Sequence, residues 1–180
     1  MTEEPSDERR SALKPPPLGI GAATKEAHFV AAPLLTAAAL SLAGVVGGAD
    51  DEFRWPGPTL LLLVVTALTL VFSMQLAYNA RTFLYPRQDL VDDLAGSEGG
   101  PPSDDYVDEM FANAQARWRQ ENRHAVAVYD LGTVLLGLGI AASLAPPECG
   151  RQAAWRWTAA AVVLVCSLAD GAWAAFWKKY

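Results

Sequence analysis

Two aspartates, Asp130 and Asp170, interrupt otherwise apolar stretches of this chain. A carboxylate at the middle of a membrane span costs about 2.5 to 3.5 kcal/mol, so such a residue is a candidate for a function. One chemistry is a proton or cation path in which the carboxylates exchange charge during transport. The other is structural: each Asp hydrogen-bonds a neighbouring helix or pairs with Arg81 and so locks the helices together. The sequence leaves both interpretations open.

Other polar side chains are expected at a similar depth. At 1.5 Å per residue, Asp130 and Asp170 lie roughly 8 and 12 Å from the ends of their helices on one side of the membrane. Polar residues recur on one face of the second apolar stretch, and a histidine marks the start of the first. We predict an intramembrane polar cluster, open toward the inner side, made of Asp130, Asp170, Gln75, Asn79, Ser167 and His28.

Patterns for catalysis or metal binding are weak. His28 and His124 are the two histidines, and neither has the Cys, His or acidic spacing of a metal site. The stretch Gly99 to Pro101 lacks the Gly-Lys-Ser/Thr ending of a phosphate-binding loop. We therefore expect no catalytic residue, no metal ion and no cofactor, and we predict that the protein is not an enzyme.

The elements that position these groups are long apolar stretches. Each runs about 22 residues, and a bilayer core of roughly 30 Å needs about 20 residues of helix. This predicts an all-α polytopic membrane protein with four transmembrane helices arranged as two hairpins. The stretches are Ala27 to Gly48, Pro58 to Ala80, Ala125 to Pro146 and Ala153 to Trp177.

The basic residues give an orientation. Of the 14 Lys and Arg residues, only Arg54, Arg151 and Arg156 lie in or around the two turns within the hairpins; the others lie at the two ends and between the hairpins. Basic residues concentrate on the cytoplasmic side. We expect both termini in the cytoplasm of a bacterial cell whose inner membrane holds the protein. The net charge of -6 argues against nucleic-acid binding.

Four regions follow from these patterns. Residues 1–26 are polar and contain Pro15-Pro16-Pro17, which predicts a disordered cytoplasmic tail. Residues 27–80 form the first hairpin, 81–124 a cytoplasmic connector, and 125–180 the second hairpin. The second span is expected to continue as helix to about Tyr85, before Pro86.

The connector carries an amphipathic helix from about residue 103, with Ser103 as its N-cap, that continues into the third span. Its apolar stripe needs a partner. The candidates are the inner end of the second span or the Leu90-Val91-Leu94 segment, the same stripe of another subunit, or the membrane surface, aided by Arg117, Arg119 and Arg123. The stripe predicted to bind a partner consists of Val107, Met110, Phe111, Ala114 and Trp118.

These features favour a non-enzymatic membrane anchor, scaffold or signal-responsive effector that acts through its connector. Its partners would be the lipid bilayer and either a cytoplasmic protein or a second copy. The alternative is a small transporter or channel subunit that uses Asp130 and Asp170. The sequence names no ligand, ion or partner.

Overall fold

The computed structural model describes residues 26–83, 89, 91, 103–147 and 152–177. Within these residues all regular structure is helical, and four helices are long and apolar enough to cross a membrane, as predicted. Except for Glu26, the predicted tail at 1–26 lies outside the described residues. So does the Leu90-Val91-Leu94 segment, apart from Val91.

The first candidate span begins with a widened turn. A π-helical turn, η1 (Ala27–Ala31), leads directly into α3 (Ala32–Gly48), and the Ala32 N–H donates to the Ala27 carbonyl five residues back. Pro33 supplies the reason, because its ring clashes with the carbonyl of a regular preceding turn and it has no N–H to donate. This turn carries His28 and Phe29.

A short 3-10 turn, η2 (Asp50–Glu52), connects α3 to α4 (Pro56–Arg81). The helix starts two residues before the predicted Pro58, since proline suits the first helical turn. It also ends earlier than the predicted Tyr85. The Thr82 and Phe83 N–H groups donate to carbonyls three residues back, both at 3.2 Å, and this tighter turn closes the helix.

The third long helix, α6 (Asp104–Leu144), has 41 residues and joins the amphipathic segment to the apolar one without a break, as expected. Ser103 occupies the N-cap, but its side chain makes no capping hydrogen bond, so the predicted role of its hydroxyl is wrong. The helix ends at Leu144 because Ala145 precedes Pro146, and a residue before proline disfavours helical backbone.

The last helix, α7 (Ala153–Trp177), packs mainly against α6. Arg156 in its first turn reaches back to α6: its Nε donates to the Leu144 carbonyl at 3.2 Å and an Nη to the Ser143 carbonyl at 3.4 Å. These carbonyls have no partner within their own helix end, so Arg156 satisfies groups that would otherwise be left unbonded.

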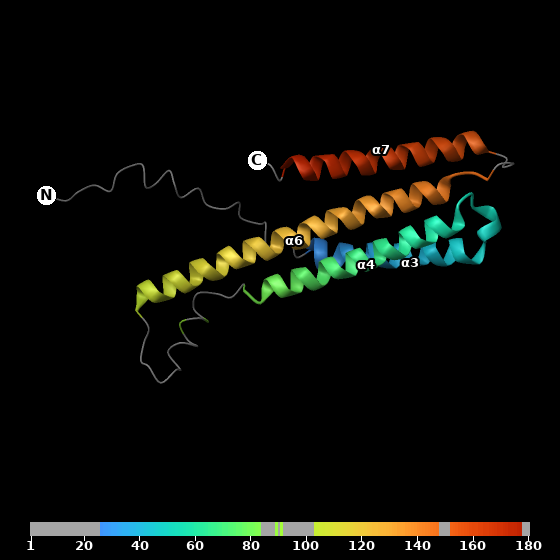
Figure 1. Cartoon of the computed structure of the whole chain (residues 1–180). Helices are drawn as coiled ribbons and strands as arrows, with labels where there is room; N and C mark the ends of the chain where they lie inside the picture. Colours follow the sequence, from blue (N-terminus) through green and yellow to red (C-terminus); the bar gives the residue numbers. More distant parts are fainter. Residues whose placement is uncertain (1–25, 84–88, 90, 92–102, 148–151, 178–180) are drawn as a thin grey trace.

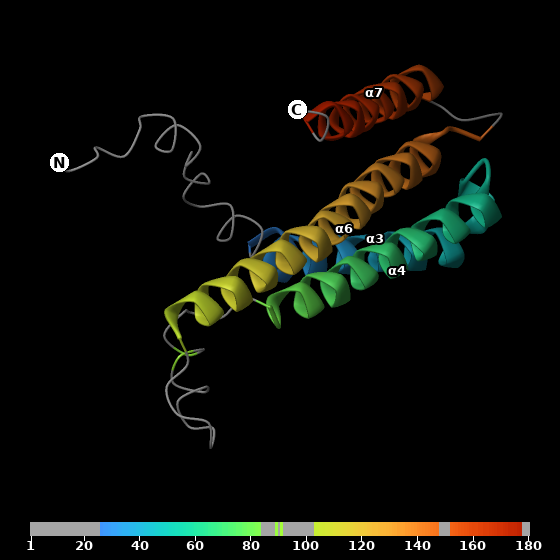
Figure 2. The same cartoon turned by 60° about the vertical axis from the view of Figure 1, so that its left-hand side comes forward.

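In the bundle α4 packs against both α3 and α6, α3 lies behind α4, and α7 lies on the far side of α6 (Figures 1 and 2). The buried core joins α3, α4 and α6 and contains Leu63 and Leu136 together with small residues of α3. Gly139 lets Leu63 approach the α6 backbone, since a Cβ there would lie 2.7 Å from the Leu63 side chain. The α6 end that begins at Asp104 extends past the other three helices (Figure 1).

Candidate functional site

His28 and Tyr129 form the centre of the polar region of the bundle. The His28 side chain is 1% exposed, and its ring lies 5.3 Å from the Tyr129 ring at a tilt of 48°. The widened turn before Pro33 places His28 on the side of the helix that faces α6. This contact joins the start of the first candidate span to the third.

Asp130 and Asp170 lie close to one contact between α6 and α7. Gly171 meets the Val134 side chain, since a Cβ on Gly171 would lie 2.9 Å from Val134 Cγ2. Asp170 precedes Gly171, and Asp130 is four residues, or about one helical turn, from Val134. Both carboxylates therefore belong to the same part of this helix pair.

The two aspartates differ in exposure. Asp130 is half-buried and Asp170 is exposed at the edge of α7. The Thr133 hydroxyl donates to the Asp130 backbone carbonyl at 2.8 Å, within α6. Tyr129 thus contacts His28 and directly precedes Asp130 on α6, while Asp170 lies on the neighbouring α7.

Ser167 joins α7 to α6 at a different point. Its hydroxyl donates to the Val163 carbonyl at 2.9 Å, within its own helix. A Cβ at Gly137 would overlap the Ser167 side chain, so the two backbones approach closely here. The contact is one of steric fit, and it helps to set the register of α7 on α6.

Gln75 and Asn79 belong to a separate groove. Both are exposed and line a cavity of about 430 Å³ with Phe29, Met74 and Tyr78. Arg81 lies over the Phe29 ring at 4.1 Å from its centroid, a cation-π contact. The predicted cluster is therefore divided between Asp130, Asp170, Ser167 and His28 on one side and the Phe29 groove on the other.

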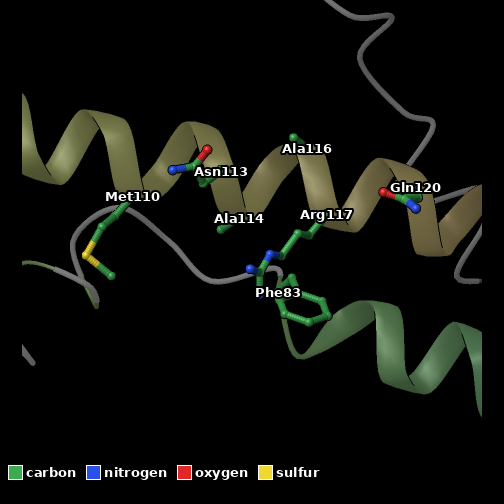
Figure 3. Close-up of a pocket in the computed structure, with 7 residues that line it drawn as sticks. All are labelled: Phe83, Met110, Asn113, Ala114, Ala116, Arg117 and Gln120. Carbon is green, nitrogen blue, oxygen red and sulfur yellow. The ribbon is translucent and has the colours of Figure 1, made fainter.

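The predicted partner-binding stripe is only partly accessible. Val107 and Ala114 are buried within the chain, at 1% and 6% exposure, whereas Met110, Phe111 and Trp118 are half-buried. Beside the stripe, Phe83 after α4 and a polar face of α6 enclose a groove (Figure 3).

Sequence reasoning missed Phe29 and Phe83 as site residues. The signal for Phe29 was Pro33, whose effect on the preceding turn decides where Phe29 points. The signal for Phe83 was the early end of α4, which follows from local hydrogen bonds that hydropathy does not report.

Metal ligands and cysteines are the remaining reactive groups to place. In the described part of the chain, no group of three or more His, Cys, Asp or Glu residues could hold a metal ion, and Cys166 is exposed on α7. Cys149 lies outside the described residues. No known protein family, curated protein or solved structure matches the chain.

Proposed function

We propose that this protein is a non-enzymatic, multi-pass integral membrane protein of a bacterial inner membrane. Both termini lie in the cytoplasm, and two helical hairpins cross the bilayer. It serves as a membrane anchor, scaffold or signal-responsive effector. Its working surface is the cytoplasmic part of α6.

The length of α6 is the observation that carries this proposal. Its 41 residues extend about 60 Å, whereas a bilayer core of roughly 30 Å takes up about 20 residues. About half of the helix is therefore free to project into water. The charged residues of its first turns, Asp104 and Asp105, suit that environment.

The projecting half presents half-buried apolar side chains to a partner. Met110, Phe111 and Trp118 keep part of their surface exposed although neighbouring Val107 and Ala114 are covered within the chain. Aromatic and Met side chains with one covered and one open side are typical anchors of protein interfaces. The partner is a cytoplasmic protein or a second copy of this chain.

Photo-crosslinking tests this proposal with little change to the fold. A benzophenone amino acid at Phe111 or Trp118, in the full chain within its own membrane, should crosslink to a discrete partner or to a second copy. The same group at Gln115, which is exposed on another face, is the matched control and should give little product.

Substitution gives the second arm of the test. Phe111→Ala with Trp118→Ala should release the crosslinked partner or lower the oligomeric mass, while Gln115→Ala with Arg119→Ala should not. If crosslinking, co-purifying proteins and mass are the same for both pairs, α6 does not act as a docking surface.

A second function is favoured by the grouping of acids at the α6–α7 contact. Asp130 and Asp170 flank the contact between Val134 and Gly171, and Asp130 is next to Tyr129 in the chain. Carboxylates so placed inside a membrane are suited to carry protons or cations. In this case the protein is a small transporter or channel subunit.

Flux measurements decide between the two functions. In proteoliposomes, Asp130→Asn with Asp170→Asn should abolish proton or cation flux if the protein transports ions. Asp51→Asn, an exposed acid in the turn after α3, is the control and should retain it. An inactive parent protein, or a double variant that is as active as the parent, removes transport from consideration.

A further inference from the structure

A groove of about 570 Å³ lies between the end of α4 and the middle of α6 (Figure 3). Phe83 forms one wall, and Met110, Asn113, Arg117 and Gln120 line the other. These four residues of α6 recur at helical spacing and share one face, with the Arg117 side chain extending toward the end of α4 (Figure 3). The lining thus combines a cation and two amides with an aromatic ring and a thioether.

The groove lies just beyond the apolar segments. Phe83 follows the end of α4 by two residues, and Gln120 precedes the apolar stretch of α6 at Ala125 by five. Five residues of helix span about 8 Å. Because the headgroup layer adds roughly 5 to 8 Å on each side of the hydrocarbon core, the Phe83 and Gln120 end of the groove lies at headgroup level. Arg117 lies about one turn further out, and its long side chain can reach back to that level.

The charges of α6 are arranged to attract an anion at that level. The acids of its first turns, Asp104 to Glu109, are farthest from the apolar stretch, while Arg117, Arg119 and Arg123 are nearest. Arg117 carries no salt bridge within the described residues, and Glu121, one turn further on, does not line the groove. A guanidinium so placed matches the geometry of a phosphate, to which it donates two parallel hydrogen bonds.

We propose that this groove is a binding site for the phosphate headgroup of an anionic phospholipid. Arg117 binds the phosphate, and the Asn113 and Gln120 amides donate to its remaining oxygens or to the glycerol. Phe83, two residues beyond the end of α4, contacts the adjoining acyl chain. Bound lipid fixes the projecting half of α6 relative to the membrane, a role that goes beyond docking of a protein to the stripe.

Binding of fluorescent phosphatidylglycerol to the full-length protein in neutral detergent micelles tests the site. Arg117→Gln should weaken binding about tenfold, the size expected for losing hydrogen bonds to a charged group. Arg119→Gln is the matched control, because it removes the same charge two residues away from an exposed position outside the groove, and should change affinity less than about twofold. Arg117→Lys should fall between parent and Arg117→Gln.

Three results would overturn the proposal. Equal weakening by Arg117→Gln and Arg119→Gln would mean diffuse surface charge instead of a site. Phosphatidylcholine binding as tightly as phosphatidylglycerol would remove the requirement for an anionic headgroup. Competition by millimolar inorganic phosphate would make a soluble phosphate the ligand. Circular dichroism and gel filtration of each variant exclude misfolding as the cause.

Discussion

Gly137 of α6 and Ser167 of α7 lie so close together that a Cβ atom on Gly137 would overlap the Ser167 side chain. Since the Ser167 hydroxyl is bonded within its own helix, the contact depends on the absence of a side chain at residue 137. Small residues of this kind let helices approach where lipid supplies no hydrophobic driving force between them. Gly137 thus allows α7 to approach α6 closely.

Replacing Gly137 by Ala should therefore weaken the α6–α7 contact. Overpacking costs about 1 to 3 kcal/mol, and the better helix propensity of Ala returns up to about 1 kcal/mol. Gly44→Ala is the matched control, since nothing lies within 4 Å of a Cβ there. Unfolding titrations in mixed detergent micelles should show Gly137→Ala less stable than the parent and Gly44→Ala equal or more stable. If the two variants change stability by the same amount, Gly137 and Ser167 are not in close contact.

Arg156 should stabilise the turn between α6 and α7. Arg156→Met removes the hydrogen bonds to the Leu144 and Ser143 carbonyls and should lower the free energy of unfolding by about 1 to 2 kcal/mol. Arg156→Lys keeps a single charged donor and should recover part of the loss. The same titrations measure both variants. A Met variant as stable as the parent would show that these bonds contribute nothing.

The buried ring of His28 should support the contact with Tyr129. His28→Ala leaves a cavity and should cost about 2 kcal/mol or more, whereas His28→Phe keeps an aromatic pair and should retain most of the stability. Tyr78→Ala is the control, because that ring is 65% exposed and should change stability by less than about 0.5 kcal/mol. Thermal aggregation in detergent ranks the three, and an Ala variant at His28 that matches Tyr78→Ala contradicts the packing role.

The proposed orientation predicts which residues a membrane-impermeant maleimide reaches. In a chain with Cys149→Ser and Cys166→Ser, a cysteine at Asp51 should react in cells whose outer membrane has been permeabilised. A cysteine at Gln115 should react only after the inner membrane is opened. Both positions are exposed, so access to the reagent depends on the side of the membrane. The reverse labelling pattern would mean that the protein has the opposite orientation in the membrane.

Much of the architecture is encoded locally and could be predicted. The four long helices follow from apolar length, because a span must satisfy its own backbone hydrogen bonds. The single helix from Asp104 follows from the lack of Pro and Gly between residues 103 and 131. Where local prediction was wrong, at the end of α4 and at the Ser103 cap, a few hydrogen bonds decided the outcome.

Which polar residues share a site was decided by tertiary structure. Helical spacing placed Gln75 and Asn79 on one face of α4 and Asp170 near Ser167, but spacing within a helix does not say which neighbour that face meets. The closest approaches, at Gly137 and Gly171, set the register of α7 on α6, and the widened turn before Pro33 turned His28 toward Tyr129 and Phe29 toward Arg81. The sequence by itself determined the lengths and polarity of the helices. Packing between the helices determined which of their faces meet, because steric fit depends on pairs of residues that are distant in the chain.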